Sequence, residues 1–241
     1  MTDATLLQRP LADIVTADSR TAVIFDRFGL DYCCHGHQTL TDAAAHAGIA
    51  VDAVLNDIGG LGPAGEKDAV TEWKELDDLS RYIVRRHHGY VREQTPVIAA
   101  YLDKLVARHG ERHPELAEIR AIFTSLSEEM AAHMMKEENI LFPFIELLAV
   151  NARKGGRLPA GPFGTVMNPV RMMEEDHREA GESLTQLRQL TSAYTPPPDG
   201  CTTYRLCYKE LADFEADLHR HIHLENSVLF PQAVELERRL S

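Results

Sequence analysis

The sequence has few cysteines and little positive charge, and each shortage excludes a class of protein. Four cysteines in 241 residues are too few for the disulfide framework of a small secreted domain. The formal net charge of −12 at pH 7 argues against nucleic acid as a partner, because nucleic-acid binding normally requires a basic surface. We therefore expect neither a disulfide scaffold nor a nucleic-acid partner.

Signals for secretion and for membrane insertion are also missing. The start, MTDATLLQRP, has neither the basic region nor the apolar core of a signal peptide. The longest apolar stretch, NILFPFIELLAV, covers residues 139–150 and includes Glu146, whereas a membrane-spanning helix needs about 20 apolar residues. These absences predict a cytoplasmic protein without a membrane partner.

Strand-like alternation of apolar and polar residues is absent, which predicts an all-α fold. Long segments instead place apolar residues at helical spacing, and stretches rich in glycine and proline separate them. Short connections make antiparallel neighbours, so residues 71–241 are predicted to form an up-down four-helix bundle. Its helices are expected at about 72–109, 114–150, 167–194 and 201–239.

The N-terminal part of the chain is predicted to be a separate small helical domain. It covers residues 1–58, and residues 59–70 are interpreted as a linker because of their glycines and proline. Helix boundaries are expected at an N-cap such as Thr39 and at a C-terminal glycine such as Gly29.

One pattern in the bundle occurs twice, as HMMKEENILFP and HIHLENSVLFP. Each copy has a histidine and, four residues later, a glutamate: His133 with Glu137, and His221 with Glu225. Four residues of α-helix turn through about 400°, so both side chains lie on one face, one turn apart. A single such pair is common on helix surfaces. Two copies with the same ending favour a joint role in the core.

The predicted turns give an independent test of this hypothesis. In an antiparallel hairpin, residues equally far from the turn lie at the same height. The turns near residues 110 and 199 each have a histidine about 22 residues before and after them, roughly 33 Å along the helices. One histidine from each helix therefore reaches a common level. We predict a metal site formed by His88, His133, Glu137, His177, His221 and Glu225.

The same geometry excludes other histidines from the ligand set. His109 is about 30 Å along the helix from His88, so we leave it out. His87 points about 100° away from His88, and His219 and His223 point about 200° away from His221. These three are predicted either to face solvent or to lie just outside the ligand set.

Four imidazoles and two carboxylates suit two first-row transition ions better than one. Each ion would take two histidines, and both glutamates could bridge the ions, leaving room for an oxo bridge or a small ligand. A structural zinc site is usually closed and rich in thiolates, and ferritin-type bundles use more carboxylates. This donor set predicts a non-haem di-iron centre, with manganese as the open alternative.

Five segments resemble, in order along nearly the whole chain, those of the iron-sulfur cluster repair family called RIC, YtfE or ScdA. They are RFGLDYCC, HMMKEENILFP, EEDHREAG, PPPDGCTTY and HIHLENSVLFP. The bundle also resembles hemerythrin-like di-iron domains. The resemblance implies a cytoplasmic di-iron protein with such a bundle, often a homodimer, made under nitrosative or oxidative stress. Such a protein would restore damaged iron-sulfur proteins by iron donation, and some relatives bind or reduce nitric oxide. By motif, the family's metal ligands fall on the same six residues.

Other functions stay open at this point. A hemerythrin-like carrier or sensor of nitric oxide or oxygen would need the same centre without repair activity. A nitric oxide reductase would use it for turnover, so whether the protein is an enzyme is also open. A metal-free helical phosphotransfer protein would need one exposed histidine, which four histidines at one level disfavour.

The paired cysteines lie in the segment Cys33-Cys34-His35-Gly36-His37. Members of the family usually have glycines and a basic residue after the pair. The two imidazoles here could change the pKa of the thiols or add a metal-binding option; the alternative is a loop whose histidines do little. Adjacent cysteines rarely form a disulfide without strain. We therefore predict a redox or iron-transfer role for Cys33 and Cys34.

Overall fold

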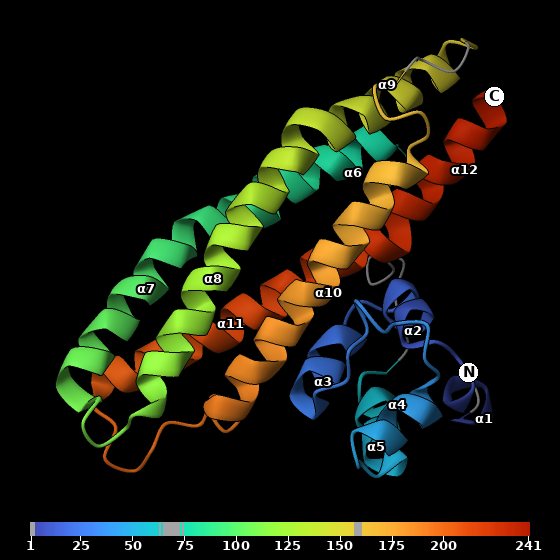
Figure 1. Cartoon of the computed structure of the whole chain (residues 1–241). Helices are drawn as coiled ribbons and strands as arrows, with labels where there is room; N and C mark the ends of the chain where they lie inside the picture. Colours follow the sequence, from blue (N-terminus) through green and yellow to red (C-terminus); the bar gives the residue numbers. More distant parts are fainter. Residues whose placement is uncertain (1–2, 63, 65–72, 74, 157–160) are drawn as a thin grey trace. The chain divides into compact units, whose positions relative to one another are not determined.

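The computed structural model describes residues 3–62, 64, 73, 75–156 and 161–241 (Figure 1). Throughout these residues the chain forms helices and no β-strand, which confirms the predicted all-α class. None of the described helices is long and apolar enough to cross a membrane. Most of the predicted linker lies outside the described residues, and its first two residues belong to α5 (Val51–Gly60).

The described residues divide into two compact units. One of them, residues 82–144 and 163–218, contains the predicted four-helix bundle. Its helices lie alongside one another in Figure 1, and α8 packs against both α7 and α10. They are α7 (Gly89–His109), α8 (Glu115–Lys136), α10 (Met167–Leu190) and most of α11 (Thr202–Leu224).

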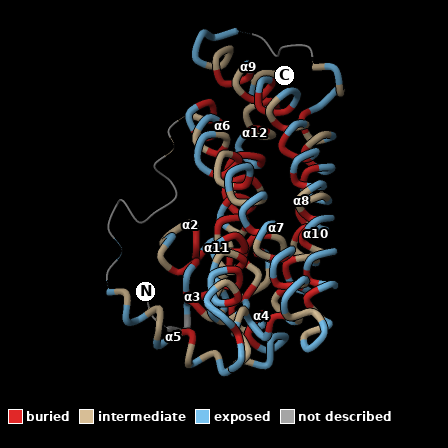
Figure 2. Tube along the Cα trace, turned by 90° about the vertical axis from the view of Figure 1, so that its left-hand side faces the viewer, coloured by how far each residue is buried: buried red, intermediate tan, exposed pale blue. Residues whose placement is uncertain are grey.

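Apolar side chains fill the interior of this bundle. Buried positions recur along each helix at helical spacing (Figure 2), as the sequence pattern predicts. The rings of Phe123 and Phe214 meet edge to face, with centroids 5.4 Å apart. Leu102 and Leu126 have no exposed surface, and burying each such side chain contributes about 1.5–3 kcal/mol.

Three short π-helical segments interrupt the long helices, a feature that the sequence analysis did not predict. They are η3 (Val84–His88), η4 (Glu137–Leu141) and η5 (Glu225–Leu229). Each begins or ends at a predicted metal ligand. Single π-helical turns inside α-helices occur frequently at functional sites, so the interruptions mark the same level of the chain that the histidine spacing indicated.

The other unit comprises the described parts of residues 1–81, together with 145–162 and 219–241. Thr39 caps its fourth helix by accepting a hydrogen bond from the Asp42 amide at 3.2 Å, and Gly29 ends the third with φ of 66°. Both boundaries agree with the sequence analysis. The helices are α1 (Asp3–Leu7), α2 (Leu11–Ala17), α3 (Thr21–Phe28), α4 (Leu40–His46), α5, α6 (Leu76–Ile83), α9 (Phe142–Arg153) and α12 (Phe230–Leu240), of which α6 and α9 cross into the bundle unit.

The third predicted helix of the bundle is four residues too long. The helix expected to end at residue 194 ends at Leu190. The Thr191 hydroxyl accepts a hydrogen bond from the Tyr194 amide at 3.0 Å, and residues 192–194 all have positive φ. The side chain of Thr191 thus competes with the helical backbone pattern and ends the helix. In contrast, α7 continues through Pro96.

Candidate metal centre

Glu137 lies at the centre of the buried ionisable groups of the bundle. Its Oε2 atom is 3.3 Å from Nε2 of His88 and 3.3 Å from Nε2 of His133. His133 is one turn before Glu137 on α8, while His88 ends η3. All three side chains are 0–2 % exposed. Two helices thus direct imidazole nitrogens at one carboxylate oxygen.

A third helix adds His177. Its Nε2 atom is 3.1 Å from Nε2 of His133, and the two rings have centroids 4.7 Å apart. His177 lies on α10 and is fully buried. Three of the four predicted histidines therefore gather around Glu137, at the level expected from the distance to the turns.

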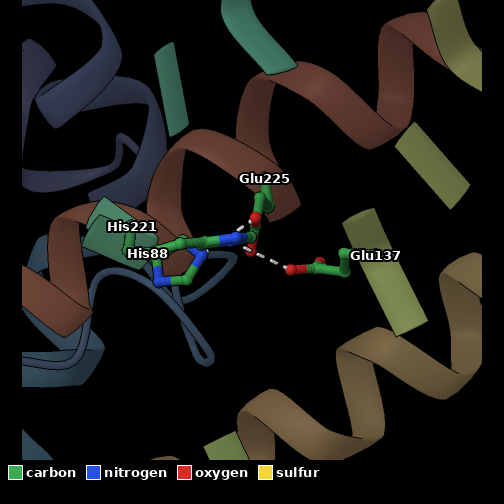
Figure 3. Close-up of side chains that lie close together, drawn as sticks. All are labelled: His88, Glu137, His221 and Glu225. Atoms are coloured by element: carbon green, nitrogen blue, oxygen red, sulfur yellow. Dashed lines mark hydrogen bonds and ion pairs between the residues drawn. The ribbon is translucent and has the colours of Figure 1, made fainter. Parts of the chain in front are cut away.

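The second His–Glu pair repeats the geometry of the first. Nε2 of His221, near the end of α11, lies 3.0 Å from Oε1 of Glu225, at the start of η5, and both side chains are fully buried. Figure 3 shows His221 and Glu225 with His88 and Glu137, their polar ends directed toward one another.

The six predicted residues form two overlapping groups of four, and within each group the ligand atoms lie within 4.8 Å of one another. The first group is His88, Glu137, His221 and Glu225. The second is His133, Glu137, His177 and Glu225. Each group has two histidines of its own, and the two groups share both glutamates.

Carboxylates outside this set orient two of the imidazoles. Nδ1 of His88 lies 2.6 Å from Oε1 of Glu138, and Nδ1 of His133 lies 3.0 Å from Oδ2 of Asp176. An imidazole that donates from Nδ1 to a carboxylate presents the lone pair of Nε2, as in many metal sites. The sequence analysis missed both carboxylates, although each is adjacent in sequence to a predicted ligand.

Asp176 is suited to this role because it remains ionised. The hydrogen bond with His133 lowers the pKa of Asp176 to about 2, and the ammonium group of Lys136 acts in the same direction. Burial opposes the shift without reversing it. Asp176 can therefore accept a hydrogen bond from the protonated Nδ1 of His133 throughout the neutral pH range.

The donor set fits a bound transition-metal ion. When Nδ1 is the donor, the Nε2 atom of His88 and that of His133 each carry a lone pair. Each of these atoms lies 3.3 Å from Oε2 of Glu137. Two such groups repel one another unless a cation lies between them. Two metal–ligand bonds of about 2.0–2.1 Å at a right angle put their ligand atoms about 3 Å apart, close to these separations. Fully buried carboxylates also need a positive partner.

The other bundle histidines differ in part from expectation. His109 is remote from the cluster, with its ring against those of His113 and Tyr204. His87 is 4 % exposed and lies 3.0 Å from Asp217, so the alternative that it faces solvent is wrong. The reason is the width of the buried face at η3, which includes both His87 and His88.

His223 is also buried, and His219 is partly buried. His223 is 2 % exposed, and the Tyr32 ring lies edge-on to both imidazoles, with centroids 5.6 Å and 5.9 Å away. Nδ1 of His219 lies 2.8 Å from Asp26. The angular argument considered the bundle helices alone, whereas the N-terminal helices pack on this part of the chain.

The paired cysteines occupy the loop between α3 and α4. Their sulfur atoms are 3.7 Å apart, so they are not joined by a disulfide. Cys33 is buried and Cys34 is half-buried. The Cys33 carbonyl accepts a hydrogen bond from the side-chain amide of Asn226 at 3.1 Å, and Asn226 directly follows Glu225.

Comparison with known proteins defines the class of this chain. Residues 79–233, which include all six predicted ligands, match the hemerythrin HHE cation binding domain. Residues 7–61 match the ScdA_N domain, described as a domain of unknown function. The chain is thus a hemerythrin-domain protein, and this membership implies that it binds iron.

Full-length relatives define the family more closely. The iron-sulfur cluster repair proteins YtfE of Escherichia coli O1:K1 and Escherichia fergusonii are each 34 % identical to this chain over 228 residues, which cover 94 % of this chain and 96 % of the relative. The YtfE protein of Escherichia coli O81 is 33 % identical over the same shares. The chain belongs to the YtfE family of iron-sulfur cluster repair proteins, as its motifs predicted.

Proposed function

We propose that this protein is a di-iron protein that repairs iron-sulfur clusters damaged by nitrosative or oxidative stress. The observation that carries the proposal is the pair of overlapping four-residue groups, which provides two ion positions with two shared carboxylates. The function of its full-length relatives, iron-sulfur cluster repair, supports the repair role. We further propose that it acts in the cytoplasm as a homodimer on damaged iron-sulfur proteins.

Each side chain of the centre has a distinct task in this proposal. His88 and His221 would hold one ion, His133 and His177 would hold the other, and the two positions would share both glutamates. Glu138 and Asp176 keep the Nδ1 protons of His88 and His133 in place. Iron held there would supply coordination positions for nitric oxide or another small diatomic.

The apolar wall of the centre limits what can reach it. The Phe142 ring stacks on His88, with centroids 5.8 Å apart, and the six donor side chains are 0–2 % exposed. A diatomic gas fits such a closed site better than an organic substrate. Iron that is donated to a damaged cluster is the cargo of the repair reaction, and we propose Cys33 and Cys34 as the residues that accept it or supply electrons.

Iron content tests the core of the proposal. Purified protein should hold about two irons per chain, and the variant Glu137→Leu with Glu225→Leu should hold less than about a tenth of that, because both ion positions lose their shared carboxylates. The variant Glu128→Leu with Glu182→Leu makes the same change at two exposed positions and should keep two irons. Full iron retention by the first variant would overturn the proposal.

A carrier or sensor of nitric oxide or oxygen is the second candidate, and the closed, apolar surroundings of the centre favour it equally. The two functions differ in what happens to the iron. Iron-loaded protein should restore the activity of an enzyme whose cluster has been damaged by nitric oxide, with a matching loss of iron from this chain. Reversible gas binding without iron transfer would establish the second candidate instead.

A further inference from the structure

A second group of ligand atoms occurs in the loop between α3 and α4, outside the bundle centre. Asp31, Cys33 and Cys34 bring one oxygen and two sulfur atoms within 4.8 Å of one another. The two sulfurs are 3.7 Å apart, and Sγ of Cys33 is 3.2 Å from Oδ1 of Asp31. The three residues lie within four positions of the sequence.

We propose that Asp31, Cys33 and Cys34 form a second metal site, which binds one divalent transition-metal ion through two thiolates and one carboxylate oxygen. The sulfur–sulfur distance supports this assignment. An ion with two metal–sulfur bonds of about 2.3 Å at a tetrahedral angle holds its sulfurs about 3.8 Å apart. The sulfurs of a disulfide are about 2.05 Å apart, so the loop has the spacing of a chelate.

Hydrogen bonds hold the loop in this conformation before any ion binds. Oδ1 of Asp31 accepts from the backbone amides of Cys33 and Cys34, at 3.1 Å and 2.9 Å. Nδ1 of His35 lies 2.6 Å from Oδ2 of Asp31. With the contact from Asn226 to the Cys33 carbonyl, these bonds fix both the carboxylate and the direction of the thiols, so little ordering remains for the ion to impose.

An ion at these three donors has to displace a proton. The hydrogen bond between the two thiols, burial and the nearby Asp31 all raise the pKa of the Cys33 thiol well above its usual value, so this thiol keeps its proton until an ion binds. Burial opposes ionisation of Asp31, but hydrogen bonds from His35 and the Cys34 amide hold the pKa of Asp31 below its usual value. Binding one ion therefore releases the two thiol protons to solvent and forms two metal–sulfur bonds.

The loop has an open approach, unlike the bundle centre. A cavity of about 240 Å³ beside it is lined by residues that include Asp31, His35, Gln38 and His46. Water or a side chain of another protein can supply the fourth ligand from there. Two thiolates select soft or borderline ions such as zinc, cadmium or ferrous iron over magnesium and calcium.

Cadmium binding to the full-length, iron-loaded protein tests the proposal under reducing, oxygen-free conditions. A cadmium–thiolate bond gives an ultraviolet charge-transfer absorption, and the ligands of the bundle centre contain no sulfur. We expect one cadmium per chain with this absorption, its loss in Cys33→Ser and in Cys34→Ser, and at least tenfold weaker binding by Asp31→Asn. Cys201→Ser and Cys207→Ser are the matched controls and should bind as the parent does.

Two outcomes would overturn the proposal: absence of the thiolate absorption at stoichiometric cadmium, or its persistence in both the Cys33 and the Cys34 variant. Cys34 is only half-buried, so its substitution keeps the test decisive even if Cys33→Ser fails to fold. The iron content of each variant is measured alongside. It reports the bundle centre, so failure of the second site is distinguishable from failure of the proposed di-iron function.

Discussion

The bundle centre and the Cys33–Cys34 loop gather ligand atoms in opposite ways. The bundle centre takes nitrogen and oxygen donors from positions 88 to 225, all of them fully buried. The loop takes sulfur and oxygen donors from residues 31–34, two of them half-buried. In the bundle the fold assembles the donors, whereas in the loop the local backbone already does so. This difference predicts how each site responds to unfolding and to substitution.

Metal removal should separate the two sites most strongly. The bundle ligands disperse when the chain unfolds, so bound iron stabilises the folded state by about 4 kcal/mol when free iron is 1,000-fold above its Kd. We expect chelation of this iron to lower Tm by roughly 10 °C. The loop donors stay close in the unfolded chain, so removing cadmium from the loop should shift Tm far less. Calorimetry on the parent protein measures both, and equal shifts would contradict the comparison.

Loss of a single histidine should empty one position of the bundle and leave the other occupied. His177 belongs to one ligand group and His221 to the other. His177→Ala and His221→Ala should therefore each hold about one iron per chain, with affinity at the damaged position reduced more than 100-fold. Metal analysis and Mössbauer spectra give the count.

His109→Ala is the control for this comparison, because His109 is remote from the cluster, and it should keep two irons. Cys33→Ser should also keep two, since the loop contributes no ligand to the bundle ions. Loss of both irons from His177→Ala would indicate that the two positions fill as one unit.

The carboxylates outside the ligand set should have a smaller effect. Asp176→Asn loses the charge that orients His133, and substitutions of this kind lower metal affinity about 10- to 100-fold. Competition with a coloured chelator measures the change. Glu175→Gln, at an exposed neighbour paired with Arg178, should leave the affinity unchanged; an equal loss in both variants would point to a general loss of charge.

A pH-dependent contact that includes none of the predicted ligands should give the smallest effect. Hydrogen bonds to Asp199 and to Glu115 raise the pKa of His113 above its usual value of 6.5. The stabilisation is therefore complete below pH 6.5 and is lost as the pH rises through the raised pKa of the folded state. Urea unfolding at pH 6 and pH 9 should show a larger drop for the parent than for His113→Gln, with iron binding unaffected by the substitution.

Much of the bundle was predictable because its apolar residues and its histidines recur at regular spacing in the sequence. Apolar spacing gave the four helices, and equal distances from two turns gave the common level of His88, His133, His177 and His221. Those distances depend on helical rise alone, so no knowledge of packing was needed. The roles of these residues as ligands, the domain boundaries at 58 and 71, and the role of the cysteines remain predictions.

The parts that escaped prediction depend on contacts outside any single helix. The burial of His223 follows from the N-terminal segment, where the Tyr32 ring in the loop after α3 packs against it. Asp176 and Glu138 act through hydrogen bonds to histidines on other helices, and Asp31 acts through a backbone turn. Spacing along a single helix contains no information about these contacts.

The π-helical turns have a consequence for how this chain tolerates changes in length. Each turn accommodates one residue more than the α-helix around it needs. Deleting a residue within Glu137–Leu141 would restore plain α-helix without rotating the helix that follows, because the wider turn already absorbs the extra residue. The inward side of α9, which includes Ile145 and Leu148, would therefore stay inside. The extra residue thus changes the backbone path only at the level of the predicted ligands, while the helix on either side keeps its apolar stripe inside.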